Sequence, residues 1–214
     1  MVRLLKNVIS MSDVSDMTIL LLPTSAEIEY QKEMRTNEYL KTIQWIQDNL
    51  SDYETIWIEC VSLGDSFIEK YSKVFYSQLH NPDFINKGAN LGIALKKFMG
   101  ENVIDQELIV QFTGRYHFMD DYFFRVMKDN PGYDLYAMDD GHSQYFTGCF
   151  ALKKELFSKW VNETDWVSLN NLMINIEKSL WNFARDNNLN VYELDSIHMD
   201  CNIFGNGNPV RAKR

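Results

Sequence analysis

Three short, β-rich runs constrain the fold more than any other feature of this sequence. They are residues 17–22 (MTILLL), 55–61 (TIWIECV) and 107–113 (ELIVQFT). The first run is continuously apolar, which is typical of a strand that is buried on both faces of a sheet. Segments with apolar residues at helical spacing separate the runs. We therefore predict an α/β fold with a mixed, mostly parallel central sheet and helices on both faces.

The rest of the chain continues the alternation of helices and strands. We read it as one domain over residues 1–214, in which residues 1–16 and 205–214 are peripheral, because this length supports one substantial core. Apolar spacing predicts helices over 27–50, over 67–79, after 86–90, from Tyr122 to Asn130, over 153–161 and over 168–187, and strands over 134–138, 143–152 and 191–197.

Charge and cysteine content exclude several classes of protein. A formal net charge of −9 argues against a broad nucleic-acid-binding surface, because contacts with phosphates need clustered Lys and Arg. Cys60, Cys149 and Cys201 are widely spaced and odd in number, as expected for reduced core thiols rather than for a disulfide framework. No apolar run is long enough for a signal peptide or a transmembrane segment, so we expect a cytoplasmic protein.

The common nucleotide and hydrolase motifs are missing. The chain has no G-x-G-x-x-G after its first strand, no G-x-x-x-x-G-K-[ST] and no G-x-S-x-G. Candidate chemistry therefore rests on polar residues at the ends of predicted strands, where open α/β sheets bind ligands. These residues are Glu59, Lys87, Arg115, Asp139, Asp140, His142, His198 and Asp200.

Two of these positions favour an anionic ligand, and a third is a carboxylate in an apolar run. Thr113, Gly114, Arg115 and Tyr116 follow a strand, and Arg115 is the first candidate, although a solvated loop cation fits the same pattern. Lys87 and Gly88 precede a predicted helix, where free backbone N–H groups and a cation suit a phosphate, but the pair also fits an ordinary loop. Glu59 lies in an apolar run, so it has either a structural partner or a ligand.

A metal ion is a second way to meet an anionic substrate. Asp139, Asp140 and His142 follow a predicted strand, and two carboxylates with an imidazole can hold Mg²⁺ or Mn²⁺. His198 and Asp200 are placed to complete such a site. The alternative is an ordinary tight turn between strands. Among the tryptophans, only Trp166 lies in a predicted loop, where it can serve as a platform for a sugar.

The order of these elements and motifs resembles a group of small GT-A-type glycosyltransferases found in bacterial surface-polysaccharide clusters and large DNA viruses. The resemblance extends over residues 17–203. It rests on the strand that ends in Glu59, on Asn86-Lys87-Gly88 before a helix, on Thr113-Gly114-Arg115-Tyr116, and on Thr147-Gly148-x-Phe150 before Lys153-Lys154-Glu155-Leu156-Phe157.

The resemblance implies a GT-A-like domain that transfers a sugar from a nucleotide-diphosphate donor to a glycan or another hydroxyl acceptor. It implies a donor site at Thr24, Glu59, Lys87, Gly88, Thr113, Gly114, Arg115 and Tyr116, an acceptor site at Thr147, Gly148, Asp165 and Trp166, and catalytic roles for Arg115, Asp139 and Asp140.

One departure from the family pattern leaves the source of positive charge open. GT-A enzymes typically carry Asp-x-Asp after the central strand, and Thr-Gly-Arg-Tyr stands there in this chain. Either Asp139, Asp140 and His198 hold Mn²⁺ or Mg²⁺, or cationic side chains replace the metal, because the departing nucleoside diphosphate gathers negative charge. Asp139, Asp140, Glu163 and Asp165 are candidates for the base that deprotonates the acceptor.

Two other classes of function stay open. A sugar nucleotidyltransferase uses a related sheet, but normally has a glycine-rich stretch with Arg and Lys after its first strand, and residues 23–27 (PTSAE) have none of these. A non-catalytic binding module with a GT-A-like fold would explain the missing Asp-x-Asp.

Overall fold

A seven-stranded sheet forms the centre of the molecule. The computed structural model describes residues 17–27, 32–79, 81, 83–201 and 210–211, so most of the two segments predicted to be peripheral lies outside the described residues. The strand order is β3-β2-β1-β4-β7-β6-β8. Its strands are β1 (Thr18–Thr24), β2 (Glu54–Glu59), β3 (Lys73–Tyr76), β4 (Leu108–Phe112), β6 (Leu135–Ala137), β7 (Cys149–Lys153) and β8 (Val191–Glu193).

The sheet is mixed and mostly parallel, as predicted. β1 pairs in parallel with β2 and β4, β2 with β3, and β6 with β8, whereas β7 is antiparallel to both β4 and β6. The three β-rich runs at residues 17–22, 55–61 and 107–113 correspond to β1, β2 and β4. These are adjacent strands of this one sheet, in the order β2-β1-β4. Their carboxyl ends lie at Glu59, Thr24 and Phe112, on one edge of the sheet.

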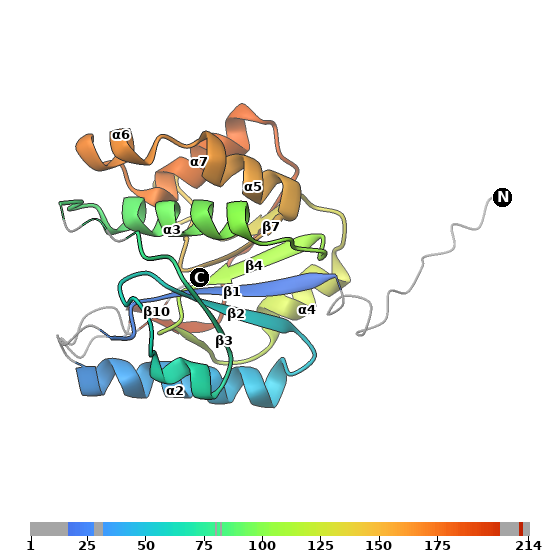
Figure 1. Cartoon of the computed structure of the whole chain (residues 1–214). Helices are drawn as coiled ribbons and strands as arrows, with labels where there is room; N and C mark the ends of the chain where they lie inside the picture. Colours follow the sequence, from blue (N-terminus) through green and yellow to red (C-terminus); the bar gives the residue numbers. More distant parts are fainter. Residues whose placement is uncertain (1–16, 28–31, 80, 82, 202–209, 212–214) are drawn as a thin grey trace.

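Helices cover both faces of the sheet. Figure 1 shows α3 (Lys87–Glu101), α5 (Lys154–Glu163), α6 (Trp166–Asn171) and α7 (Ile176–Asp186) on one face, and α2 (Lys32–Asn49) on the other. α4 (Tyr122–Asp129) packs into the same apolar cluster as α2. Along β1, Leu20 and Leu22 face α2, whereas Ile19 and Leu21 face α3, so the continuous apolar run is explained by burial on both faces.

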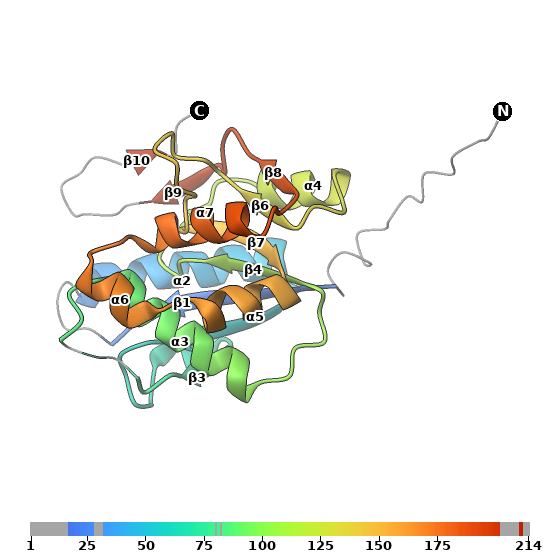
Figure 2. The same cartoon turned by 90° about the horizontal axis from the view of Figure 1, so that it is seen from above.

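A second, three-stranded sheet has the order β10-β9-β5 and joins β5 (His117–Phe118), β9 (Met199–Cys201) and β10 (Val210–Arg211). Figure 2 shows β9 and β10 on the side of the molecule where β6 and β8 lie, away from β3. Because β5 begins directly after Tyr116, pairing of β5 with β9 anchors the far side of the loop that follows β4.

Two sequence predictions are wrong. Residues 67–79 form a 3₁₀ turn, η1 (Phe67–Lys70), followed by edge strand β3, not a helix. The run Lys73-Val74-Phe75-Tyr76 pairs with β2 through the backbone, which overrides the helical spacing of its apolar residues. The helix predicted over 168–187 is two helices, because Met173 has a left-handed φ of 53° and the backbone carbonyl of Ile174 accepts from the Asn86 side chain.

Among the described residues, no helix combines the length and the apolar character that crossing a bilayer would require.

Candidate functional site

A cleft opens at the carboxyl edge of β1, β2 and β4, the edge where α2 and α3 begin (Figure 1). Its volume is about 370 Å³, within the range of small-molecule sites. We call it the cationic cleft, because Arg35, Lys87 and Arg115 line it and no carboxylate of the described residues does. The full lining is Pro23, Thr24, Ser25, Arg35, Tyr39, Cys60, Val61, Phe84, Ile85, Lys87, Asn90, Leu91, Thr113 and Arg115.

The loop after β4 places Arg115 in this cleft. The backbone N–H of Thr113 donates to the carbonyl of Gly148, and that of Gly114 donates to the carbonyl of Pro23. A Cβ atom on Gly114 would lie 2.6 Å from Cζ3 of Trp57, so only glycine fits this close approach. Gly114 therefore lets this loop pack onto the core.

A carboxylate from α2 orients Arg115. Nη1 of Arg115 lies 3.3 Å from Oε2 of Glu38, and the two side chains are 21% and 12% exposed. Oε1 of Glu38 has no hydrogen-bond partner among the described residues. Glu177 on α7 accepts from the hydroxyl of Thr147 at 2.8 Å.

The first turn of α2 also shapes the end of β1. Nη2 of Arg35 donates to the carbonyl of Ser25 at 2.6 Å, and the hydroxyl of Tyr39 accepts from the backbone N–H of Ser25 at 3.0 Å. Burial raises the pKa of Tyr39, so its phenol stays neutral. Arg35 thus adds a second cation to the cleft from a position on an amphipathic helix that no sequence motif marks.

Lys87 lies in the cleft as the first residue of α3, but the backbone around it differs from the sequence prediction. The side chain of Asn86 caps this helix and accepts from the N–H of Gly88 at 2.9 Å and from that of Ala89 at 3.4 Å. Gly88 packs against Ile176, which a Cβ atom would meet at 2.9 Å. The cap therefore occupies donors that were predicted to be free for a phosphate, and the charge of Lys87 is what this helix end offers.

Glu59 lies beneath the cleft and does not line it. The carboxylate is fully buried and accepts three backbone N–H groups, from Ala26 at 2.8 Å, Val61 at 3.0 Å and Ser62 at 3.2 Å. Burial raises its pKa, and the three hydrogen bonds oppose that rise. The predicted donor residue therefore has structural partners, and it joins the loops that follow β1 and β2.

Cys60 lines the cleft but is not a nucleophile. Cys60 and Cys149 are free and buried, as predicted, whereas the side chain of Cys201 lies outside the described residues. Burial, together with the neighbouring Glu59, raises the pKa of Cys60 to about 12, so the thiol stays protonated at neutral pH.

The structure does not bring Asp139, Asp140 and His198 together. Asp139 and Asp140 are exposed in a turn in which their carboxylates accept from the backbone N–H groups of Gly141 and His142. Nδ1 of His198 lies 2.8 Å from the carboxylate of Asp120.

Other groups near His198 account for its position. Its ring stacks on Tyr122, with ring centroids 4.4 Å apart. Burial opposes ionisation of Asp120, but the hydrogen bond with His198 prevails and lowers the pKa of that carboxyl. Across the described part of the chain, no three His, Cys, Asp or Glu side chains are grouped as metal ligands. The residues present therefore do not fit the predicted metal site.

Thr147 and Gly148, predicted for the acceptor, lie beside the cleft but are buried. The carbonyl of Thr147 accepts from the Gln111 side chain, and the space above Gly148 is filled by the ring of Phe146, which a Cβ atom would meet at 2.2 Å. Phe146 in turn stacks on Tyr116 at 6.3 Å. These contacts make the Thr147-Gly148 segment a support for the loop that carries Arg115.

Trp166 and Asp165 have structural partners on the far side of α3. Trp166 is 4% exposed, its indole N–H donates to the carbonyl of Val161 at 2.9 Å, and its ring fills the space above Gly92. Asp165 caps α6 by accepting from the N–H of Ser168. Trp166 is therefore a core residue and not an open sugar platform.

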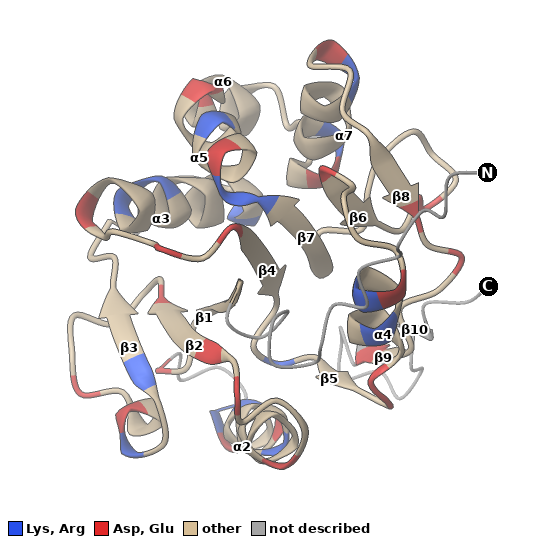
Figure 3. Cartoon of the chain, turned by 90° about the vertical axis from the view of Figure 1, so that its right-hand side faces the viewer, with Lys and Arg blue, Asp and Glu red and all other residues tan. Residues whose placement is uncertain are grey.

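Figure 3 shows acidic and basic residues interspersed on α2, α3, α4 and α5, without a continuous basic face in that view. Positive charge is concentrated in the cationic cleft instead. Sequence reasoning found Lys87 and Arg115 there, but it missed Arg35, Tyr39, Phe84 and Ile85, which carry no motif.

Comparison with solved structures defines the class of fold. The chain has the fold of the nucleotide-diphospho-sugar transferases. No protein-family model and no curated protein matches the sequence.

Two solved structures illustrate the likeness. A protein of Desulfovibrio desulfuricans G20 assigned to the nucleotide-diphospho-sugar transferases aligns with a TM-score of 0.53 at 12% identity, over 83% of this chain and 79% of its own. A mannosyltransferase of Pyrobaculum calidifontis, solved with GDP-mannose and Mn²⁺, aligns with a TM-score of 0.56 at 12% identity, over 89% of this chain and 58% of its own.

Proposed function

We propose that this protein is a glycosyltransferase that moves a sugar from a nucleotide-diphosphate donor to a glycan or another hydroxyl acceptor, with the donor diphosphate bound in the cationic cleft. One observation carries the proposal. Arg35, Lys87 and Arg115 line a single cleft at the carboxyl edge of the sheet, in a chain whose net charge is −9. Such local concentration of positive charge is what a diphosphate needs from an acidic protein.

The fold supports the same assignment. Ligands of open α/β sheets bind outside the carboxyl ends of the strands, which is where the cationic cleft lies. α2 and α3 both begin at this edge, so their dipoles add positive potential there (Figure 1). The mannosyltransferase with the same fold was solved with a nucleotide sugar, GDP-mannose.

In this proposal the cations act on the leaving group. Cleavage of the sugar–phosphate bond leaves a nucleoside diphosphate whose added negative charge must be stabilised. The guanidinium of Arg115 offers two parallel N–H donors to phosphate oxygens. Lys87, at the start of α3, adds a point charge to the same cleft. Glu38 orients Arg115 and limits its motion before the donor arrives.

The proposed transfer also needs a group that accepts the proton of the acceptor hydroxyl. Asp139 and Asp140 stay the predicted bases, but neither lines the cationic cleft in this structure. Their participation would require movement of the turn that holds them.

A divalent cation is not required by the residues in the cleft, so we propose that cationic side chains take over its role of stabilising charge. A donor diphosphate that carries Mn²⁺ into the site is compatible with this arrangement. Donor binding should therefore persist in the presence of EDTA, whereas a site that depends on a protein-held metal would lose it.

The test is to incubate the protein with a panel of UDP-, GDP-, CDP- and dTDP-sugars, with Mn²⁺ or with EDTA. Binding would be measured by calorimetry, and turnover by release of the nucleoside diphosphate. A glycosyltransferase releases nucleoside diphosphate from at least one donor, and hydrolysis of that donor is a detectable side reaction without an acceptor. If the protein binds none of these donors, the assignment is refuted.

A parallel incubation with nucleoside triphosphates and sugar phosphates, assayed for pyrophosphate, separates the two alternatives. A sugar nucleotidyltransferase consumes a nucleoside triphosphate and a sugar phosphate and releases pyrophosphate. A non-catalytic module binds a donor without turnover. The stretch after β1, Pro23-Thr24-Ser25-Ala26-Glu27, lacks the glycine-rich sequence of the nucleotidyltransferases, which favours the transferase.

A further inference from the structure

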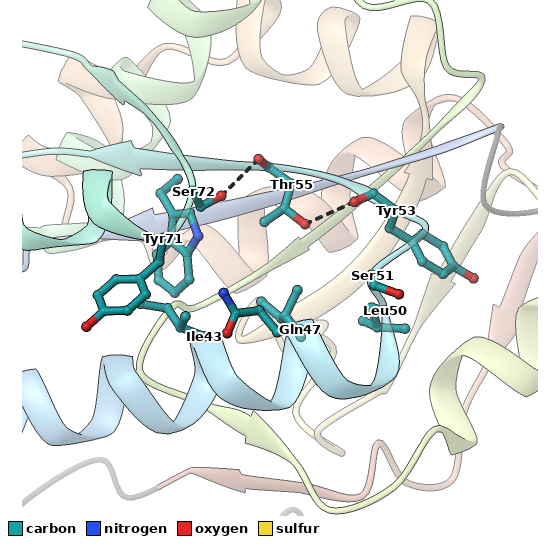
Figure 4. Close-up of a pocket in the computed structure, with 10 residues that line it drawn as sticks. Ile43, Gln47, Leu50, Ser51, Tyr53, Thr55, Tyr71 and Ser72 are labelled. Atoms are coloured by element: carbon teal, nitrogen blue, oxygen red, sulfur yellow. Dashed lines mark hydrogen bonds between the residues drawn. The ribbon is translucent and has the colours of Figure 1, made fainter.

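A second cavity lies between α2, β2 and the turn after η1, away from the cationic cleft. Its volume is about 290 Å³, and its lining is Ile43, Ile46, Gln47, Leu50, Ser51, Tyr53, Thr55, Trp57, Tyr71 and Ser72. Figure 4 shows Ile43 and Gln47 on α2, and Ser51 just after this helix, facing Thr55 and Ser72 across the cavity, with Tyr71 at one end. No residue lines both cavities. We call this second cavity the α2 pocket.

Among the described residues, no charged side chain lines the α2 pocket. In the whole chain 24% of residues are charged, and the cationic cleft contains three cations. A ligand with a net charge would lose part of its hydration on entering the α2 pocket and would find no group of opposite charge in the lining. The pocket therefore suits an uncharged ligand, and its volume suits a single ring rather than a complete nucleotide sugar.

Trp57 supplies an unused hydrogen-bond donor. Its side chain is 1% exposed and lines the α2 pocket. None of the described residues accepts a hydrogen bond from its indole N–H. Buried indole N–H groups usually find a partner, and an unmet one costs free energy. Nε1 of Trp57 is not among the fully enclosed side-chain atoms that lack a partner, so this donor is open to water or to a ligand in the α2 pocket.

The other polar groups divide into used and unused ones. The hydroxyl of Ser72 donates to the carbonyl of Thr55, and that of Thr55 donates to the carbonyl of Tyr53, as the dashed lines in Figure 4 show. Gln47 and Ser51 make no side-chain hydrogen bond within the described part of the chain. Unused groups therefore include a donor from Trp57, an amide that both donates and accepts, and a hydroxyl.

We propose that the α2 pocket binds an uncharged sugar ring, as a carbohydrate-binding site separate from the cationic cleft. A pyranose has one apolar face, which matches the ring of Tyr71, 47% exposed, and the aliphatic side chain of Ile43. Its rim carries hydroxyls that both accept and donate, which matches Trp57 and Gln47. A nucleobase would favour aromatic rings on both of its faces, and Tyr71 is the exposed aromatic residue in this lining.

The test is NMR spectroscopy of the ¹⁵N-labelled full chain, because the five tryptophans give few indole signals, which sequential assignment can distinguish. The probes are the methyl glycosides of glucose, galactose, mannose and N-acetylglucosamine, each titrated to about 20 mM, well above a Kd of about 1 mM. We expect saturable movement of the Trp57 indole signal with at least one glycoside. Uridine and adenosine serve as uncharged controls without a pyranose.

Surface variants locate the binding. Gln47→Ala and Tyr71→Ala should each weaken the glycoside by about tenfold, the effect of one lost hydrogen bond or ring contact. Gln44→Ala is the matched control, because Gln44 lies one turn earlier on α2, pairs with Asp48 and does not line the pocket. The proposal is overturned if no glycoside moves the Trp57 signal, if only a nucleoside does, or if both pocket variants bind like the Gln44 control. Loss of donor binding in the cationic cleft would leave this result unchanged.

Discussion

Replacement of Arg115 by Ala tests the proposed function most directly. If Arg115 stabilises charge on the departing diphosphate, kcat/KM for the donor should fall by about 10²–10³, the effect of removing one preorganised donor. Arg115→Lys should restore only part of the activity, because an ammonium group cannot reproduce the planar fork. The cleft would keep Arg35 and Lys87, so weak donor binding should persist.

The same change has a cost in stability that can be worked out from the contact with Glu38. Both side chains are less than a third exposed, at 21% and 12%. The cost of leaving Glu38 unpaired therefore falls between the values for surface and buried pairs, at about 1–3 kcal/mol. For a domain of this size, that corresponds to a fall in Tm of about 2–12 °C. The double variant Arg115→Ala with Glu38→Gln should recover stability without recovering activity.

Melting temperature and release of nucleoside diphosphate would be measured on the same preparations. Arg125→Ala is the matched control, because Arg125 is 59% exposed on α4 and pairs with Asp121. If Arg115→Ala keeps kcat/KM within about threefold of the unchanged protein, the charge argument is wrong, since such a change is below 1 kcal/mol. A destabilised but active variant would make the Arg115–Glu38 pair purely structural.

Three further perturbations follow from individual contacts. Lys87→Ala should weaken binding of nucleoside diphosphate by about three- to tenfold without a change in Tm, because Lys87 is exposed, and Lys96→Ala on the same helix is the calorimetric control. Gly114→Ala should cost about 1–3 kcal/mol in urea unfolding, because its Cβ would lie 2.6 Å from Trp57, and an unchanged midpoint would contradict that packing. Glu59 has a raised pKa in the folded state, so its contribution to stability is present below its ordinary value of 4.5 and declines as pH rises through the raised value. The unfolding free energy of the unchanged protein, relative to that of Glu59→Gln, should therefore fall as pH rises above 4.5. A relative rise over this pH range would refute the direction of the pKa shift.

The central sheet was predictable because burial on both faces leaves a strong signal in the sequence. Residues 17–22 have almost no polar side chain, and β1 lies between two apolar clusters, so the sequence pattern and the tertiary environment agree. The same agreement holds for β2 and β4.

Edge elements were harder to predict, because their local pattern conflicts with their tertiary pairing. Val74 and Phe75 have a helical spacing relative to Phe67 and Tyr71, but β3 needs only one neighbour strand and a short run of β-formers. The break between α6 and α7 depends on Asn86, which lies more than 80 residues away in the sequence. No local pattern can report such a contact.

The candidate site was predictable where a residue follows a strand directly. Thr24, Thr113 and Arg115 lie within three residues of a strand end and line the cleft. Arg35 and Tyr39 reach the same cleft from a helix face, and the periodicity of that helix does not distinguish a cleft-lining residue from a solvated one. Glu38 was missed for the same reason.

The source of positive charge in the cleft links these observations. In many helix-edge sites, backbone N–H groups meet the anion, but here Asn86 accepts from the first donors of α3, and this cap joins α3 to the α6–α7 turn. The backbone of α3 is thus used to stabilise the fold. Beyond the helix dipoles, the charge for a ligand therefore comes from side chains, and Arg35, Lys87 and Arg115 approach the cleft from three separate segments. Loss of any one of them should weaken binding without abolishing it, whereas loss of the Asn86 cap should destabilise the domain without directly removing charge from the cleft.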